Sequence, residues 1–268
     1  MTIFVKDNGV ELFSNAISPC CQKVKMCLYE LNLTFDEHEV SLDSKENLST
    51  WFRGINPDAT LPALKIGDKV ISDSTQICLH LAREFGSGRL MPSDVKSYSK
   101  MLSILGLLDE KLHPASACLL WPMCIRPTFL KMEYSDAIEL IKAIPNKARQ
   151  SRQKSLFQRG LDADEVAEGV KTYEAIMSEI DLDLRDMNWL SGDHFGLADI
   201  SLAPYLQISK QFGWGDLISE YPALEELFSR LSTRPSFKRG VMDSISVESR
   251  TSMLIEGRAK SAKIYGLR

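Results

Sequence analysis

The alternation of strand-like and helix-like segments constrains the fold of this chain more than any other feature. As far as about residue 85, short apolar runs such as Val10–Phe13 alternate with segments whose apolar residues recur at the spacing of one helical face. After Gly86-Ser87-Gly88 no segment has the pattern of a strand, and the patterned stretches have helical spacing. The sequence therefore predicts a mixed α/β domain over residues 1–86 and an all-α domain over residues 93–268.

Local signals place the individual elements. Capping residues mark helix starts, Asn56-Pro57 ends a helix because the residue before proline is driven out of the helical region, and Gly67-Asp68 supplies a hairpin turn. In the α/β domain we expect strands at Val10–Phe13 and Leu33–Val40, a helix from Ser18 to about Leu31, a short irregular helix over Ser44–Arg53, a hairpin over Leu61–Ile71 and a helix opened by Ser72-Asp73-Ser74. In the all-α domain we expect long helices from Pro92-Ser93-Asp94 and over Val166–Leu184, and a buried helix from Asp199 to about Gln207.

Composition excludes several classes of function. The formal net charge of −4 is too small to suggest nucleic acid or an acidic membrane surface as a partner. No apolar run approaches the ~20 residues that a membrane-spanning helix needs. The six cysteines do not form a disulfide framework, which favours a reducing, cytoplasmic setting. The four histidines are scattered and stand at no ligand-like spacing from a cysteine pair, so we expect no metal site.

The segment Ser18-Pro19-Cys20-Cys21 begins the first predicted helix. Ser18 falls where a helix N-cap belongs, and Pro19 sits at the first helical position, where its missing N–H costs nothing. A hydroxyl at the positive end of a helix, beside free amide donors, can hold an anion, and a thiolate is one such anion. Taken alone, the segment also fits a well-capped helix with no further role.

Pro62 lies in a predicted strand, where proline is awkward because it donates no hydrogen bond. It is tolerated if the strand is at the edge of the sheet, or if the Leu61–Pro62 peptide bond is cis. In either case Leu61 keeps a free backbone N–H and C=O, which can pair with an extended peptide ligand by strand addition. An edge strand without a ligand is the alternative.

Asp73-Ser74 stands at the start of another predicted helix. Both residues are ordinary capping residues. A hydroxyl and backbone N–H groups at a helix start also bind a carboxylate, and an adjacent aspartate can pair with an α-ammonium group. The pair therefore predicts a site for the free end of an amino acid.

Together these segments resemble a known family. Four motifs resemble, in order, those of the thioredoxin-like domain of the cytosolic glutathione transferases: Ser18-Pro19, Asn56-Pro57, Leu61-Pro62-Ala63-Leu64 and Asp73-Ser74-Thr75-Gln76-Ile77. The stretch Trp189–Ser201 resembles the family's capping motif at its central helix. The resemblance spans roughly residues 10 to 240, and it implies a thioredoxin-like α/β domain followed by an all-α domain.

The resemblance also implies roles for particular residues. Ser18 corresponds to the serine whose hydroxyl hydrogen-bonds the glutathione thiolate, which lowers the pKa of that thiol. Leu61-Pro62 would present its backbone to the cysteinyl unit, while Asp73 and Ser74 would hold the γ-glutamyl end. A basic residue usually meets the glycyl carboxylate, and Lys45 lies in the corresponding region.

The function implied is that of a cytoplasmic, homodimeric glutathione transferase of the detoxification type. It would use glutathione as co-substrate and attack an apolar, aromatic small-molecule electrophile, by conjugation, ether cleavage or dehalogenation. A narrower likeness, to the bacterial glutathione-dependent β-aryl-etherases of lignin breakdown, rests on Trp51-Phe52 ahead of Ile55-Asn56-Pro57 and on the Ile144–Phe157 segment. We expect Leu119, Trp121 and Met123 as candidates to line the second substrate's pocket, although they equally suit a core.

Some residues depart from the family pattern and leave alternatives open. Cys20 and Cys21 suggest a glutathione-dependent thiol–disulfide oxidoreductase, but Cys20 lies two residues late for the family's catalytic cysteine, so we expect a packing role. Gly196 replaces the usual Ser or Thr cap, at a slight expected cost in helix stability. The basic run from Lys147 to Arg159 is expected to be a solvated helix face. The other alternative is a non-catalytic interaction module with this fold.

Overall fold

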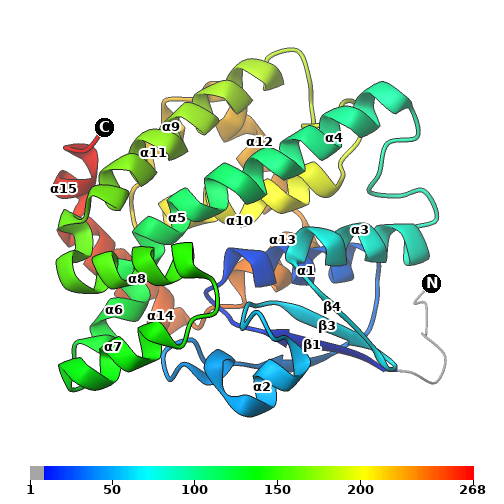
Figure 1. Ribbon diagram of the computed structural model, residues 1–268. Coiled ribbons are helices and arrows are strands. Elements are labelled where there is room, and N and C mark those ends of the chain that lie inside the picture. The colour runs from blue at the N-terminus through cyan, green and yellow to red at the C-terminus, as the bar shows by residue number, and fades with distance from the viewer. Residues whose placement is uncertain (1–8) are drawn as a thin grey trace.

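The computed structural model describes residues 9–268 (Figure 1). Its only sheet within this range has four strands, in the order β2 (Asp36–Glu39), β1 (Val10–Ser14), β3 (Ala63–Ile66) and β4 (Lys69–Ser72). β1 runs parallel to β2, and β3 runs antiparallel to both β1 and β4. The mixed sheet confirms the predicted α/β class. The second strand is shorter than expected, because only Asp36–Glu39 pairs with β1.

Side-chain alternation along the strands packs helices on both faces of the sheet. Leu12 points into the main core with α1 (Pro19–Glu30) and α3 (Ser74–Phe85), whereas Phe13 joins Phe52 of α2 (Thr50–Ile55) in a smaller cluster on the opposite face. Figure 1 shows α1 and α3 on one side of the sheet and α2 on the other. The expected irregular helix before Asn56 is therefore two pieces, a helical turn η1 (Glu46–Leu48) and α2.

The rest of the described chain is helical, with no strand after Ser72 among residues 9–268. Helices and single π-helical turns follow one another without a break from Val95 to Phe129. The elements are α4 (Val95–Leu107), η2 (Leu108–Leu112), α5 (His113–Leu120), η3 (Trp121–Ile125), α6 (Arg126–Phe129), α7 (Tyr134–Lys142), α8 (Lys147–Arg159), η4 (Gly160–Asp162), α9 (Asp164–Leu184), α10 (Leu197–Gln211), α11 (Asp216–Ser219), α12 (Pro222–Ser232), α13 (Pro235–Phe237), η5 (Lys238–Met242), α14 (Val247–Ala259) and α15 (Ser261–Tyr265).

Helix α10 is the central buried helix of this part, as expected. Asp199 in its first turn is fully buried and accepts N–H hydrogen bonds from Gly196 at 2.9 Å and from Leu190 at 3.0 Å. Gly196 is required here for a reason that the sequence did not reveal. A Cβ atom at this position would lie 2.7 Å from the carbonyl oxygen of Leu90, so the glycine permits a close backbone approach.

Helix α1 joins the two parts of the molecule. Besides packing on the sheet, it contacts α10, α13 and η5 of the helical part. At its C-terminal end Glu30 forms an ion pair with Arg234, with 2.7 Å between Oε1 and Nε. The residues at the N-terminus of α1 therefore lie on a rigid element between the sheet and the helices. Across residues 9–268, none of the helices is both long enough and apolar enough to cross a membrane.

Candidate active site

Ser18 caps the N-terminus of α1 as predicted. Its backbone is extended, with φ −78° and ψ 118°, and its Oγ accepts a hydrogen bond from the N–H of Cys21 at 3.4 Å. Pro19 follows as the first helical residue. Because Oγ uses a lone pair for the Cys21 N–H, the hydroxyl proton remains available for a second partner. The half-buried side chain of Ser18 lines a hollow between the sheet domain and the helices.

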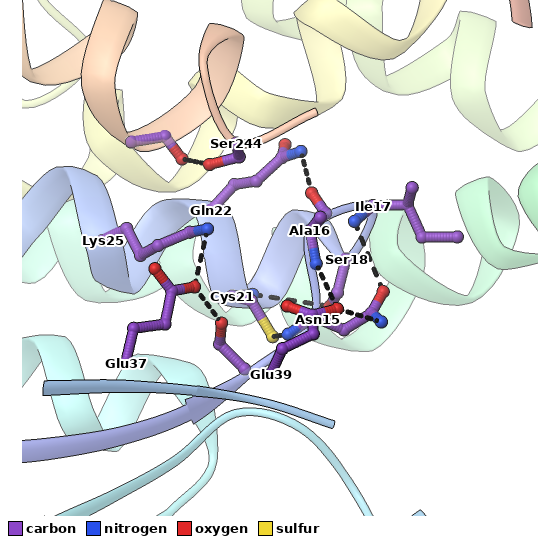
Figure 2. Close-up of polar contacts among 12 residues, drawn as sticks. Asn15, Ala16, Ile17, Ser18, Cys21, Gln22, Lys25, Glu37, Glu39 and Ser244 are labelled. Atoms are coloured by element: carbon purple, nitrogen blue, oxygen red, sulfur yellow. Dashed lines mark hydrogen bonds and ion pairs between the residues drawn. The ribbon is translucent and has the colours of Figure 1, made fainter. Parts of the chain in front are cut away.

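Hydrogen bonds from Asn15 hold the loop before Ser18 in place (Figure 2). The Asn15 Oδ1 accepts the N–H of Ile17 at 3.3 Å, and its Nδ2 donates to Glu39 of β2 at 2.8 Å. Gln22 of α1 reaches back and donates to the carbonyl oxygen of Ala16 at 2.8 Å. The loop is thus tied both to the sheet and to the helix that it precedes, which fixes the position of Ser18 relative to both.

The Leu61–Pro62 peptide bond is cis. β3 begins at Ala63 and pairs with a strand on each side, so of the two arrangements predicted for Pro62 the edge strand is wrong and the cis bond is confirmed. Among residues 9–268, the backbone N–H and C=O of Leu61 form no hydrogen bond with another residue. Leu61 lies on the wall of the site, whereas Pro62 does not line it.

Asp73 and Ser74 begin α3. Asp73 is the N-cap residue, and its Oδ1 accepts the N–H of Gln76 at 2.9 Å. Its φ of +75° lies in a region that non-glycine residues seldom adopt, and such conformations concentrate at binding sites. Asp73, Ser74 and Leu61 all line one cavity, here called the polar hollow, with a volume of about 710 Å³. The size suits a small-molecule ligand.

Ser18 opens onto an adjoining cavity of about 200 Å³, here called the apolar hollow. The two hollows share the wall residues Thr60, Leu61, His113, Arg149 and Arg152. The apolar side chains of the apolar hollow come from both parts of the chain: Ile17, Leu42, Leu48, Leu120, Trp121, Ile125 and Ile144. Four of the predicted residues, Ser18, Leu61, Asp73 and Ser74, therefore surround one continuous site.

Of the three side chains predicted to line the second pocket, only Trp121 does so. Leu119 and Met123 are in the core, with exposed fractions of 1% and 8%. Residues two apart on a helix point in different directions, so these three could not share one wall. The partners of Trp121 on this face are Cys124 and Ile125, three and four positions onward.

Lys45 is buried in the apolar hollow without a carboxylate partner among residues 9–268. Its Nζ lies 4.6 Å from the ring centroid of Phe129 and 5.8 Å from that of Trp121, within the range of cation–π attraction. Burial, and secondly the positive charge of Arg149, lowers the pKa of Lys45 to about 8, although the negative charge of Asp43 opposes this shift. A buried cation that faces a cavity and forms no direct ion pair favours an anionic ligand.

Two members of the basic run also face the site, so the expectation of a purely solvated face was wrong. Arg149 on α8 donates to the carbonyl oxygens of Asp58 at 3.2 Å and Ala59 at 3.5 Å, and Arg152 lines both hollows. Their spacing of three residues, which puts them on one helix face, was the signal available in the sequence. Lys154 on another face is exposed, as expected.

Cys20 is buried, as its expected packing role requires, but it also contacts the site. It lines the polar hollow together with His113, and its Sγ lies 3.5 Å from the His113 Nδ1. Neither His113 nor its pairing with Cys20 was foreseen, because 93 positions separate the two residues in sequence. Cys21, by contrast, is fully buried, and its sulfur accepts the N–H of Asn15 at 3.3 Å.

Both parts of the chain match known families. The family model "Glutathione S-transferase, N-terminal domain" matches residues 17–84, and "Glutathione S-transferase, C-terminal domain" matches residues 125–235. Protein LigF of Sphingobium sp. strain SYK-6 is 27% identical over 221 residues, which cover 79% of this chain and 84% of that protein. The tetrachloro-p-hydroquinone reductive dehalogenase of Sphingobium chlorophenolicum is 24% identical, with 85% of this chain and 94% of that protein covered.

Solved structures show the same fold. The crystal structure of the β-etherase LigF superimposes with a TM-score of 0.77 at 24% identity, covering 86% of this chain and 98% of LigF. A glutathione-bound theta-class transferase of Xanthomonas axonopodis pv. citri superimposes with a TM-score of 0.65 at 19% identity, covering 88% and 98%. The two domain models occur in family order and lie on the α/β and the helical parts, respectively. The chain therefore belongs to the glutathione S-transferase superfamily.

Proposed function

We propose that this enzyme uses the Ser18 hydroxyl to activate the thiol of glutathione for attack on an apolar, aromatic electrophile. Glutathione is the co-substrate of the family. The observation that carries the proposal is the arrangement of Ser18, Leu61, Asp73 and Ser74 around two adjoining hollows. These residues offer a hydroxyl at a helix start, a free backbone edge and an amino-acid anchor, as a tripeptide with a reactive thiol requires.

The contacts support one orientation of glutathione. The γ-glutamyl end would lie at the start of α3, with its carboxylate on Ser74 and its ammonium group on Asp73. The cysteinyl backbone would pair with the free N–H and C=O of Leu61, and the thiol would then point toward Ser18. The glycyl carboxylate would lie toward Lys45, the buried cation that lines the apolar hollow together with Leu61.

Ser18 would act as a hydrogen-bond donor to the thiolate. Its Oγ accepts the N–H of Cys21, which leaves the hydroxyl proton to be donated to the ligand. A donated hydrogen bond and the positive helix end both stabilise the anion, which raises the thiolate fraction near neutral pH. The thiolate attacks an electrophilic carbon, a C–S bond forms, and the leaving group departs with its bonding electron pair.

The apolar hollow supports an aromatic second substrate. Trp121 and four aliphatic side chains from the helical part and the η1 region surround the space beside Ser18: Leu48, Leu120, Ile125 and Ile144. Cleavage of a β-aryl ether is the reaction we favour, because LigF, named as a β-etherase, is similar in sequence and in fold. Reductive dehalogenation is the second candidate, given the similarity to the hydroquinone dehalogenase.

We further propose that residues 1–86 form one domain and residues 93–268 the other. The protein would work in the cytoplasm as a homodimer. Its biological role would be detoxification or lignin breakdown. The six free cysteines support a reducing compartment. The dimer rests on the family resemblance and is tested by sedimentation of the purified protein.

The Ser18→Ala variant tests the proposal. It should lower turnover of a β-aryl ether or a chlorinated nitrobenzene by about 10–100-fold, while calorimetry finds glutathione affinity changed by less than about three-fold. Ser49→Ala is the matched control, since Ser49 caps α2 through the N–H of Phe52 at 3.3 Å and lines neither hollow. Turnover that survives in Ser18→Ala would refute the role of Ser18. Failure of the wild-type protein to bind glutathione would favour a non-catalytic interaction module.

A further inference from the structure

Buried polar atoms without partners are concentrated among the residues that line the apolar hollow. Among residues 9–268, eight buried side-chain nitrogen or oxygen atoms have no hydrogen-bond partner. Four of them belong to residues of this one lining: Asn47 Oδ1, Trp121 Nε1, Arg149 Nε and Gln153 Oε1. An unpaired polar atom in a protein interior costs free energy, and most such atoms find a partner. Their concentration at one cavity therefore indicates a ligand with hydrogen-bonding groups of its own.

Asn47 of η1 and Arg149 of α8 meet at one carbonyl group. The Asn47 Nδ2 donates to the carbonyl oxygen of Ala59 at 2.9 Å, and the Arg149 guanidinium donates to the same oxygen at 3.5 Å. Gln153 follows Arg149 by about one helical turn, so the two side chains lie on the same face of α8. Two segments that are far apart in the sequence thus present three of the four unpaired atoms side by side.

Trp121 adds the fourth atom from η3. The Nζ of Lys45, which stands two residues before Asn47, lies 5.8 Å from the centroid of the Trp121 ring, so the indole is close to the same segment. Trp121 and Asn47 are more than nine-tenths buried, with exposed fractions of 6% and 8%. Their unpaired atoms cannot turn to open solvent as an exposed side chain would. We call the four residues the polar wall: Asn47, Trp121, Arg149 and Gln153.

The hydrogen-bonding character of the polar wall is fixed at three of its four unpaired atoms. Because the Asn47 Nδ2 donates to the Ala59 carbonyl, its amide cannot be turned around, and Oδ1 is an acceptor. The Trp121 Nε1 and the Arg149 Nε both carry a hydrogen and can only donate. The Gln153 amide can present either its oxygen or its NH2 group. A ligand must therefore offer this wall both an acceptor and a donor.

A hydroxyl group meets both demands with one functional group. Its oxygen accepts a hydrogen bond from Trp121 or Arg149, and its hydrogen is donated to the Asn47 Oδ1. A carboxylate accepts but does not donate, so it would leave the Asn47 oxygen unpaired. An ammonium group donates but does not accept. It would also lie among the cations Lys45, Arg149 and Arg152, and no carboxylate lines the hollow in the described part of the chain.

We propose that the polar wall selects aromatic electrophiles that carry a hydroxyl group on the ring. The apolar side chains of the hollow would hold the ring, the polar wall would bind the hydroxyl group, and the electrophilic carbon would lie beside Ser18. This inference rests on the proposed function, because it assigns the apolar hollow to the second substrate. It narrows that substrate from an apolar arene in general to a hydroxyarene, and it gives the four polar residues a role in specificity.

The test is calorimetry of the full chain, saturated with glutathione, with acetophenone and with its meta- and para-hydroxyl derivatives. These probes have the same ring and no leaving group, so binding is measured without turnover. The better hydroxyl derivative should bind about 100-fold more tightly than acetophenone, because the parent compound leaves a buried donor and a buried acceptor unpaired. Affinities that agree within about three-fold, or no binding of any of the three compounds, would overturn the inference.

Trp121→Phe keeps an aromatic ring and removes the Nε1 donor. It should weaken binding of the hydroxyl derivative about ten-fold and that of acetophenone by less than about three-fold, a difference that a merely structural role would not produce. Trp189→Phe is the matched control, since Trp189 lines neither hollow. If Trp121→Phe fails to fold, Gln153→Met replaces it, with the same expected difference. An unchanged preference for the hydroxyl derivative in the folded variant would contradict the role of the polar wall.

Binding of glutathione by the wild-type protein separates the two proposals. Glutathione binding and turnover of an aryl electrophile without a preference for the hydroxyl derivative overturn this inference alone. Absence of glutathione binding overturns the proposed function as well.

Discussion

Arg149 on α8 donates a hydrogen bond to the carbonyl oxygen of Asp58 at 3.2 Å, so a helix of the all-α part is attached to the loop that leads into Leu61. Both hollows border on this contact. The Nε of the same guanidinium is buried and has no hydrogen-bond partner in the described part of the chain. Arg149 therefore joins the two parts of the chain beside the site, with one buried N–H donor left without a partner.

Arg149→Ala should raise the KM for glutathione by about ten-fold, because a charge-assisted hydrogen bond contributes ~1.5–3 kcal/mol and part of it goes to the loop. Steady-state kinetics with varied glutathione measure the effect. Lys154→Ala is the control, since Lys154 lies on the same helix, is exposed and lines neither hollow. Equal KM values in the two variants would contradict a role for Arg149 at the site.

Lys45→Met should stabilise the protein and weaken glutathione binding together. The folded-state pKa of Lys45 is about 8, below the unfolded value of 10.5, so its charge costs free energy in the folded protein at neutral pH. The free energy of unfolding of the wild type therefore rises as the pH increases from about 8 to 10.5. The Lys45→Met variant should not show this rise. We expect a gain of about 1 kcal/mol in urea denaturation at pH 7. Loss of stability in Lys45→Met would contradict this account.

The same shift predicts a pH dependence of binding. Above pH 8 Lys45 loses its charge, so its attraction for the glycyl carboxylate weakens. Calorimetry from pH 6.5 to 9.5 should show the wild-type affinity for glutathione falling about ten-fold more than that of Lys45→Met. Parallel curves for the two proteins would place the glycyl carboxylate elsewhere.

Gly196→Ser should destabilise the protein, although serine is the usual cap in this family. The added Cβ would lie 2.7 Å from the Leu90 carbonyl oxygen, and the backbone must shift to relieve the contact. We expect a loss of about 1–3 kcal/mol in chemical denaturation. Gly106→Ala in α4 is the opposite control, since a Cβ there meets no atom within 4 Å and should stabilise the helix by up to about 1 kcal/mol.

Asp199→Ala should cost about 2–4 kcal/mol, because the buried N–H groups of Leu190 and Gly196 would both lose their acceptor. Burial raises the pKa of Asp199 to about 7, above its unfolded value of 3.8. The folded protein then binds one more proton than the unfolded chain between these values, so this residue makes stability fall as pH rises from 4 to 7. In denaturation experiments, the free energy of unfolding of Asp199→Asn should not show this fall between pH 4 and 7. An exposed control, Asp186→Ala, should change stability by less than about 0.5 kcal/mol.

Most elements of the fold could be predicted from the sequence because their signals are local. The strand at Val10–Phe13 and the cap at Ser18 depend only on neighbouring residues, and both are confirmed. The second strand shows the limit of such signals, because it was predicted over Leu33–Val40 and only Asp36–Glu39 forms it. Asp36–Glu39 is an exposed edge strand, and its length is set by its hydrogen bonds to β1 rather than by its own composition.

The residues of the site also divide into those that local sequence signals identify and those that they do not. Ser18, Asp73 and Ser74 were identifiable because a helix start makes its own binding groups out of consecutive residues, and Leu61 because Pro62 follows it. Their positions around one site agree with the prediction, and their roles in catalysis remain proposals for the variants above to test.

The sequence by itself determined the order of elements, the two kinds of structure and the helix starts, since each depends on contacts within a few residues. Only the tertiary structure decided which side chains meet across the hollows. Cys20 and His113 come together because α1 and α5 pack near the boundary between the sheet domain and the helices, and Arg149 reaches Asp58 from 91 positions away. Charge and burial at such meeting points set the pKa of a thiol or an amine, and no local pattern records them.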